Sequence, residues 1–407
     1  MKIVSNILRV ATINITRKLS KEQQIILGHL TYSTSKLWNV ANYEIHNQNV
    51  NLYELKQYMK DNFWYKNLHS QSAQAILEKL EIAWKNFFNG YTKRPHYQPP
   101  DGHIPVKWKK DGFKVINKRL RLSLSKQTKQ YLASHHGIES NYLWIDLPKN
   151  LSLNPDGIKE IEIVPHESYG SIEYVLHIIY EKHIKNYQII SNKKMAIDLG
   201  ITNLATVVIE NEDTPYIFDG KVLVSKLRWV AKEKGRLQSI LAKQKLKKSK
   251  KLHRLNVKTL NYKKDYIHKV STNIVRLAVV YQVDQIIIGK LNHGITHINI
   301  GHQTNEKLHQ IPLGKLVKMI QYKAREYGIK VIQIDESYTS QECSCCNTRN
   351  RNHRVYRGLY VCSHCGLVIN ADVNGARNIL QRVSLNPDNH HQDRSSGLGH
   401  PKRIRVA

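Results

Sequence analysis

Residues 343–374 are the most informative part of this chain: the sequence reads CSCC at 343–346, CSHC at 362–365 and NADVN at 370–374. Two Cys-x-x-Cys pairs separated by a short basic segment are typical of a tetrahedral zinc site. We therefore expect zinc to be bound by Cys343, Cys346, Cys362 and Cys365. Four thiolates leave no open coordination position, so this zinc is expected to be structural. By its spacing, Cys345 is the spare cysteine.

Two aspartates lie where an apolar segment meets a turn or a helix. Asp372 follows the second cysteine pair and opens an apolar helical pattern, while Asp198 lies in the sequence MAIDLG at 195–200. Each has a simpler interpretation, because Asp198 could cap a turn and Asp372 could be the N-cap of its helix. Two such acids, one of them beside a zinc site, favour metal-dependent chemistry.

The charge of the chain points to a polyanionic partner. The 407 residues contain 63 Lys and Arg against 32 Asp and Glu, a formal net charge of +31. Such an excess favours nucleic acid, with a membrane surface as the other option. No apolar run reaches the roughly 18 residues of a spanning helix, and the first residues lack the apolar core of a signal peptide. We expect a cytoplasmic nucleic-acid-binding protein.

The first half of the chain alternates between strand and helix patterns. Residues 1–19 read as a strand, and the capping box at 20–23 opens a helical unit that a glycine, Gly90, ends. Residues 91–125 are basic and rich in proline and glycine, and alternating apolar patterns resume at 120–124 and 174–179. This order predicts a β-rich domain that the helices interrupt.

The second half reads as an α/β domain. Strands are predicted at 194–198, 203–209, 215–218, 285–288 and 330–334, and helices at about 225–281, 312–327 and 373–383. Three strands followed by alternating helices and strands are the order of an RNase H-like fold. In that fold, acidic residues hold two divalent metals about 4 Å apart for phosphodiester hydrolysis.

Two basic clusters are candidate nucleic-acid contacts. One interrupts the long helical stretch and comprises Lys245, Lys247, Lys248, Lys250 and Lys251; the other comprises Lys107, Trp108 and Lys109. Lysines contact phosphates, and an exposed tryptophan can stack on a base. The simpler interpretations are a solvated helix surface for the first cluster and a core aromatic for Trp108.

Several motifs together carry a family resemblance. They are LWN at 37–39, AWKNFF at 83–88, AIDLGI at 196–201, KDYIHK at 264–269, YTSQ at 338–341, the two cysteine pairs, and the segment at 370–379. With these motifs the chain resembles the transposon-encoded TnpB (OrfB) proteins, which are RNA-guided DNA nucleases related to type V CRISPR effectors. The resemblance covers nearly the whole chain.

The resemblance implies a multidomain α+β fold. A β-barrel wedge domain would comprise 1–19 and 96–188, with a helical recognition domain inserted at 20–95. An RNase H-like (RuvC) α/β nuclease domain would comprise 189–337 and a final helix at 371–383, and it would carry a zinc ribbon at 338–370. Residues 384–407 are polar and basic, and we expect a disordered tail.

The resemblance also implies the partners and cofactors. A guide RNA from the transposon end would read the target DNA by base pairing, and the protein would read a short motif beside the target. Asp198 and Asp372 would bind two catalytic Mg²⁺ ions, in addition to the structural Zn²⁺.

One position departs from the family pattern. Where the family has a glutamate after the buried strand, this chain reads IGKLN at 288–292, so Gly289 takes the place of that acid. One hypothesis is that Glu336, at the end of the neighbouring strand, replaces it, since adjacent strands lie about 4.8 Å apart. Asp335 should then point to the opposite face. The alternatives are a nuclease-deficient RNA-guided repressor and, from another class, a zinc-ribbon nucleic-acid chaperone that uses no guide.

Overall fold

The computed structural model describes residues 6–47, 50–149, 151, 154–168, 171–183, 191–290, 310–356, 358–383 and 401–406. The chain divides into an N-terminal unit, Met1–His183, and a C-terminal unit, Ile184–Ala407. In the described ranges, no helix is long and apolar enough to cross a membrane.

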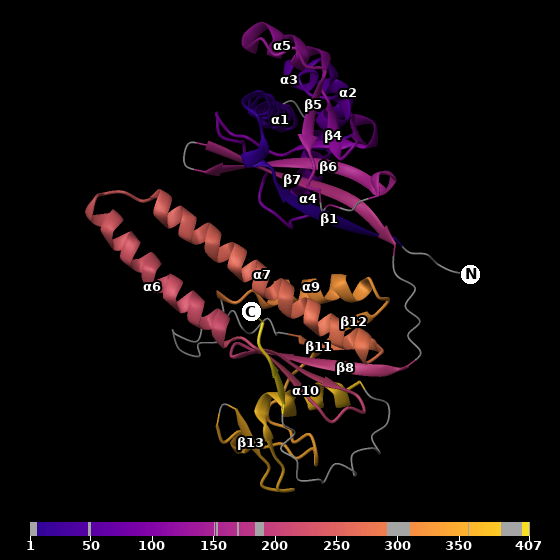
Figure 1. Ribbon diagram of the computed structural model, residues 1–407, viewed down its shortest axis with the longest axis vertical. Helices are drawn as coiled ribbons and strands as arrows, with labels where there is room; N and C mark the ends of the chain where they lie inside the picture. The colour runs from indigo at the N-terminus through magenta and orange to yellow at the C-terminus, as the bar shows by residue number, and fades with distance from the viewer. Residues whose placement is uncertain are drawn as a thin grey trace. The chain divides into compact units, whose positions relative to one another are not determined.

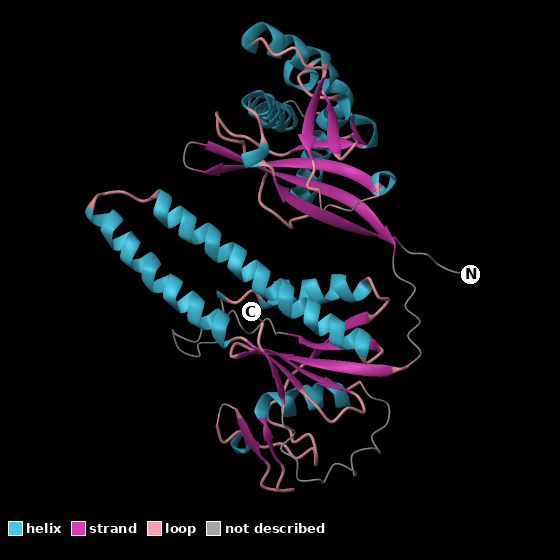
Figure 2. Ribbon diagram, in the orientation of Figure 1, coloured by secondary structure: helices cyan, strands magenta, loops and turns pink. Residues whose placement is uncertain are grey.

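The N-terminal unit combines helices with two antiparallel sheets (Figure 2). One sheet has the order β1-β7-β6-β2, formed by β1 (Asn6–Asn14), β7 (Ser171–His183), β6 (Ile158–Ser168) and β2 (Val106–Lys109). The other joins β3 (Phe113–Ile116), β4 (Arg119–Ser123) and β5 (Tyr142–Asp146). The helices are α1 (Lys21–Asn47), α2 (Leu55–Tyr58), α3 (Phe63–Lys66), α4 (Ser70–Phe88) and α5 (Lys126–His136).

The capping signals of the sequence are confirmed in this unit. Ser20 N–H donates to Gln23 Oε1 at 2.8 Å, and Gln23 N–H donates to Ser20 Oγ at 3.2 Å, which is a reciprocal capping box. Gly90 follows α4 with a φ of +74°, as a helix stop requires. Helix α5 was not expected in the β-rich segment; Ser125 Oγ accepts a hydrogen bond from Thr128 N–H at its start.

The C-terminal unit is built on a six-stranded sheet of order β12-β11-β8-β9-β10-β15. Its strands are β8 (Lys193–Leu199), β9 (Asn203–Ile209), β10 (Tyr216–Asp219), β11 (Val283–Lys290), β12 (Lys330–Asp335) and β15 (Lys402–Ile404). Strands β8, β9 and β10 are antiparallel, whereas β11 pairs in parallel with β8 and β12. All five predicted strands are present in this sheet, and the helices and strands follow one another along the chain in the predicted order.

Helices cover both faces of this sheet (Figure 1). On one face, α6 (Lys221–Lys243), α7 (Lys250–Val280) and α9 (Leu313–Arg325) pack over a core that includes Ile286 and Ile288. On the other face, α10 (Ala371–Gln381) packs through Ile379 on Ile287. The strands β13 (Leu359–Val361) and β14 (Val368–Asn370) form a hairpin next to α10.

The expectation of a disordered tail at 384–407 is wrong for its described part. Residues Lys402–Ile404 form β15, which pairs in parallel with β10, and Val406 is buried in the core that the sheet shares with α6, α7 and α9. The backbone N–H and C=O groups at the free edge of β10 need hydrogen-bond partners, and β15 provides them. Ile404 and Val406, which alternate with arginines, pack against the core of the unit. The remainder, 384–400, lies outside the described residues, as do Leu291 and Asn292 of the family motif.

Candidate active site and metal centre

The sheet brings three predicted acids to one cavity. Asp198 lies near the end of β8, Glu336 directly follows β12, and Asp372 is in the first turn of α10. Because β8, β11 and β12 are parallel, their carboxyl ends meet at one edge of the sheet. All three acids line a cavity of about 540 Å³. The other side chains that line it include Asn203, Thr206, Lys221, Arg354 and Arg403.

Glu336 occupies the space that Gly289 leaves open. Residue 289 is in register with Ile334 on β12, two positions before the glutamate. A Cβ atom at position 289 would overlap Glu336 Oε2 and would lie 3.1 Å from Ile379 Cδ1. Burial raises the pKa of Glu336 to about 6, and the charge of Asp335 contributes. The carboxyl group of Glu336 is thus set against Gly289, near the end of β11.

Asp335 does not share this cavity. Its Oδ1 accepts hydrogen bonds from Ser337 N–H at 3.0 Å and Ser337 Oγ at 2.8 Å, and the side chain is exposed. Strand alternation therefore separates the two neighbouring acids as expected.

Asp198 approaches α10 through a second glycine. Its Oδ2 would lie 2.9 Å from a Cβ atom at Gly375. Burial raises the pKa of Asp198 well above its usual value, and the charges of Asp372 and Glu336 add to this rise. The interpretation of Asp198 as a turn cap does not account for a carboxylate that faces two other acids.

Asp372 is not the N-cap of α10, because Asn370 has that role. Asn370 Oδ1 accepts from the backbone N–H groups of Asp372 and Val373 at 3.0 and 3.2 Å. The Asp372 carboxylate instead accepts from Asn203 Nδ2 at 2.7 Å through Oδ2 and pairs with Arg354 Nη2 at 3.2 Å through Oδ1. The side chain thus belongs to the cavity.

Sequence reasoning missed Gly375, Asn203 and two asparagines of α10. Asn374 Nδ2 and Asn378 Nδ2 both donate to the Glu342 carbonyl, at 2.8 and 2.7 Å, and Asn374 Oδ1 accepts from Ser344 N–H at 3.0 Å. These contacts join α10 to the first cysteine pair. The signal was present in the spacing, since residues 370, 374 and 378 share one helical face.

The four paired cysteines form a compact cluster. Their Sγ atoms all lie within 4.8 Å of one another, and the Sγ atoms of Cys343 and Cys365, like those of Cys346 and Cys362, are 3.6 Å apart. A tetrahedral site with bonds of about 2.3 Å has sulfur atoms about 3.8 Å apart. Cys345 is outside the cluster, as its spacing predicted. The four cysteines can therefore bind a metal ion.

The carboxylate oxygens of the three acids are not gathered as closely as the sulfur atoms of the cysteines. Among the described residues, the cysteine cluster is the only group of three or more His, Cys, Asp or Glu ligand atoms gathered so closely. The acids line a wider cavity, and Arg354 balances part of their charge. Thr206 Oγ1, opposite Asp198 on β9, is buried and has no hydrogen-bond partner within the described part of the chain. Hard oxygen atoms around buried negative charge are a donor set that suits Mg²⁺.

The two basic clusters differ. The lysines at 245, 247, 248, 250 and 251 are exposed around the turn between α6 and α7 (Figure 1). In the second cluster, the expectation that Trp108 contacts nucleic acid is wrong. Its side chain is 1% exposed and donates from Nε1 to the Ser123 carbonyl at 3.0 Å. Alternation along β2 turns the tryptophan into the core, while Lys107 pairs with Glu160 and Lys109 pairs with Glu78.

Two family models match the chain. One, OrfB_IS605, described as "Probable transposase", matches residues 177–293. The other, described as "Cas12f1-like, TNB domain", matches residues 314–379, which include the four clustered cysteines and Asp372.

Curated relatives agree with these models. A "CRISPR-associated endodeoxyribonuclease Cas12f1" of Sulfoacidibacillus thermotolerans is 30% identical over 51% of this chain and 50% of its own length. The "Putative RNA-guided DNA endonuclease InsQ" of Escherichia coli (strain K12) is 23% identical over 78% of this chain and 75% of its own. The "TnpB-like protein ORF457" of Acidianus two-tailed virus is 24% identical over 91% and 86%. The chain thus spans half of the first relative and most of the other two.

A solved structure shares the fold. The Cas12f1 chain of a Cas12f1–sgRNA–target DNA complex, determined by cryo-electron microscopy, superposes with a TM-score of 0.63. It covers 88% of this chain and 83% of its own, at 15% identity.

Proposed function

We propose that this chain is a member of the TnpB (OrfB) family and is the RNA-guided DNA endonuclease of a transposon. A guide RNA from the transposon end and the target DNA are its partners. The observation that carries this proposal is the gathering of Asp198, Glu336 and Asp372 around one cavity at the carboxyl ends of parallel strands. Target cleavage occurs beside a short flanking motif.

The three acids are the proposed ligands of two Mg²⁺ ions. Burial disfavours the charged form of the Asp198 and Glu336 carboxyl groups, so a bound cation would stabilise the charged form of each. When bound, such ions lower the pKa of the attacking water and stabilise the charge that develops on the phosphate. Thr206 Oγ1, buried without a partner in the described residues, gives a water molecule of that site a place to bind.

The cavity also suits a phosphate diester. Lys221 and Arg403 line it together with Arg354, so a phosphate that enters the cavity meets positive charge as well as the acids. Cations of this kind orient a phosphodiester and offset its repulsion by the carboxylates. The exposed lysines between α6 and α7 are proposed to contact the nucleic-acid backbone.

The cysteine cluster is proposed to hold a structural zinc ion. Four thiolates fill a tetrahedral shell, so this ion takes no part in hydrolysis. The parts of the chain take the family's roles: 1–19 and 96–188 as the wedge, 20–95 as the recognition domain, and 189–383 as the nuclease with its zinc ribbon.

The glycine at position 289 does not by itself favour a nuclease-deficient repressor. That alternative rested on the loss of an acid at this position, and the Glu336 side chain lies against the glycine. The unguided chaperone would use the cysteine cluster and the exposed lysines, but it gives the three acids that line one cavity no role.

Plasmid cleavage tests the proposal. The purified protein is incubated with RNA from its own locus and with a plasmid that carries the matching target, in Mg²⁺ or in EDTA. We expect cutting only with Mg²⁺ and only at the matched target, and no cutting by Asp198→Asn. Target binding without any cutting in Mg²⁺ would instead identify a repressor.

A further inference from the structure

Strand β15 is held to the nuclease sheet by both backbone and side-chain contacts. Lys402 N–H donates to the Pro215 carbonyl at 2.9 Å, and Tyr216, Ile217 and Phe218 of β10 are in register with residues 402–404. Ile404 and Val406 pack against the core of the unit. The strand is therefore fixed in place along the edge of the sheet.

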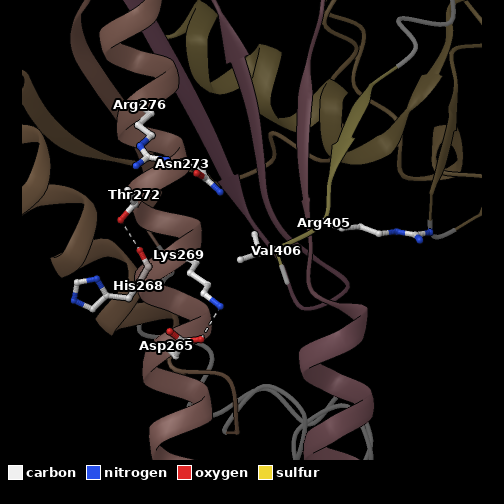
Figure 3. A pocket seen from close by; sticks show the side chains of 8 residues that line it. All are labelled: Asp265, His268, Lys269, Thr272, Asn273, Arg276, Arg405 and Val406. Atoms are coloured by element: carbon white, nitrogen blue, oxygen red, sulfur yellow. Dashed lines mark hydrogen bonds and ion pairs between the residues drawn. The ribbon is translucent and has the colours of Figure 1, made fainter.

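Figure 3 shows the anchored end of this segment. Val406 lies beside α7, in a cavity of about 420 Å³ whose other walls include Lys269, Asn273 and Arg276, while the Arg405 side chain extends away from α7. Lys269 is already paired with Asp265 at 3.1 Å in this cavity. At this end, the segment that contains β15 is thus held in place by the burial of Val406, which is 7% exposed.

The arginine at position 403 reaches the acid cavity. Arg403 Nη1 donates to Asn203 Oδ1 at 3.3 Å, and Asn203 Nδ2 donates to Asp372 Oδ2 at 2.7 Å. Asn203 is only 8% exposed, so its amide depends on these two partners for its orientation. A relay of two hydrogen bonds thus connects β15 to a proposed metal ligand.

The chemistry of the amide gives this relay a direction. An asparagine side chain has one acceptor end and one donor end, and rotation by 180° exchanges them. If Oδ1 faced the carboxylate of Asp372, the two negative oxygens would repel each other. A guanidinium group at Oδ1 stabilises the orientation in which Nδ2 faces Asp372, and it polarises the amide in the same sense.

We propose that Arg403 is a positioning residue that orients Asp372 through Asn203, and that β15 is therefore a working part of the nuclease site. With Oδ2 of Asp372 held by the amide, the orientation of the carboxylate is fixed before a metal ion arrives. Outer partners that fix a ligand in this way raise metal affinity. The proposal rests on the proposed function, in which Asp372 binds a divalent cation.

Binding of Mn²⁺, measured by electron paramagnetic resonance on the full chain, tests it. The site is defined as the Mn²⁺ binding that Asp198→Asn removes. We expect Arg403→Met to raise the dissociation constant for Mn²⁺ about 10-fold, the lower end of the effect of an outer-shell partner. Arg403→Lys, which keeps the charge and a donor, should recover part of the affinity.

Arg405→Met is the matched control. It removes the same group two residues further along the same segment, whereas the hydrogen bond to Asn203 comes from Arg403. We expect its Mn²⁺ affinity and the unfolding temperatures of both methionine variants to equal those of the parent protein. A field effect would act in the opposite sense, because removing a positive charge near the acids would tighten cation binding.

The outcomes separate this inference from the proposed function. Unchanged or tighter Mn²⁺ binding by Arg403→Met, in a protein whose parent binds Mn²⁺ and cleaves its target, overturns the positioning role alone. A parent protein with no Asp198-dependent Mn²⁺ binding overturns both. Weaker binding by Arg403→Met with an unaffected Arg405→Met supports the relay.

Discussion

The cysteine cluster and the acid cavity assemble their ligands in different ways. Each cysteine pair belongs to a tight turn. The Asn347 N–H donates to the Cys343 carbonyl at 2.9 Å, and the Gly366 N–H donates to the Cys362 carbonyl at 3.0 Å. The acids come from β8, the end of β12 and α10, so only the complete sheet brings them together. A local motif specifies the first site, whereas the second depends on the whole unit.

The two sites also differ in their effect on stability. In such clusters, the binding energy of a structural zinc ion contributes directly to folding. The acid cavity has the opposite effect without metal, because burial and mutual repulsion raise the pKa of Asp198. The proposed zinc ion would thus stabilise the fold, whereas the metal-free acid cavity destabilises it through the burial of Asp198.

The largest effect is expected at Glu336. Glu336→Gln should reduce guided cleavage by roughly three orders of magnitude, the scale of losing a central catalytic group, and should match Asp198→Asn and Asp372→Asn. Asp335→Asn is the matched control, because its carboxylate is exposed and bonded to Ser337; it should retain cleavage within about 3-fold of the parent.

Single-turnover cleavage rates with saturating guide RNA measure this difference, and target binding by each variant shows that only chemistry is lost. If Glu336→Gln kept more than a tenth of the parent rate, Glu336 would not be a metal ligand. The acid cavity would then depend on two carboxylates only.

The next effect is expected at the cysteines. Cys362→Ser should lower the bound zinc from about one ion per chain to nearly none, and it should destabilise the hairpin that positions α10. Cys345→Ser should retain zinc, because that thiol is outside the cluster. Metal analysis by mass spectrometry and thermal unfolding measure both. A parent protein without zinc, or loss of zinc by Cys345→Ser, would contradict the assignment.

The sequence predicted the strands and helices of the C-terminal unit well, because its buried strands are continuous apolar runs that end at recognisable turns. It also paired the cysteines correctly, since their spacing alone defines the cluster. The separation of Glu336 from Asp335 followed from strand alternation and from the absence of a side chain at Gly289. These features depend on neighbours in sequence or on a single strand pair.

The features that sequence reasoning missed depend on contacts between distant segments. Nothing near Arg403 indicates that it reaches Asn203, because a basic, polar segment has the composition of a tail. Trp108 was misassigned because flanking lysines resemble a binding surface, and their partners Glu160 and Glu78 are remote in sequence. Gly375 shows its role only once Asp198 is seen against it.

A smaller effect is expected at Gly375. Alanine raises helix propensity by about 1 kcal/mol, so Gly375→Ala should retain the fold. Its Cβ, however, would lie 2.9 Å from Asp198 Oδ2 and would displace that carboxylate. We expect cleavage to fall about 10- to 100-fold, since misplacement of a group by about 1 Å costs a rate factor of this order. Gly235→Ala in α6, where a Cβ meets open space, is the control and should cleave like the parent.

The smallest effect tests the opposite stability roles directly. Without metal, Asp198→Asn should raise the unfolding temperature of the protein, because the uncharged amide has nearly the same shape and no repulsion from Asp372 and Glu336. A rise of roughly 2–4 °C corresponds to about 1 kcal/mol for a domain of this size. The gain should grow as the pH rises above the ordinary pKa of an aspartate. An acid whose folded-state pKa is raised destabilises the fold above that pKa, and the penalty disappears as the pH falls through it.

For Glu336 this window lies between its folded pKa of about 6 and its ordinary value of 4.5, so the parent and Glu336→Gln should converge in stability as the pH falls from 7 to 4.5. Added Mg²⁺ should stabilise the parent at pH 8 and leave Asp198→Asn unchanged, since only the parent keeps the full set of carboxylates. Differential scanning calorimetry in EDTA and in Mg²⁺ measures both responses. An Asp198→Asn protein that unfolds at a lower temperature than the metal-free parent at pH 8 would mean that the buried carboxylate stabilises the fold, and the contrast between the two sites would disappear.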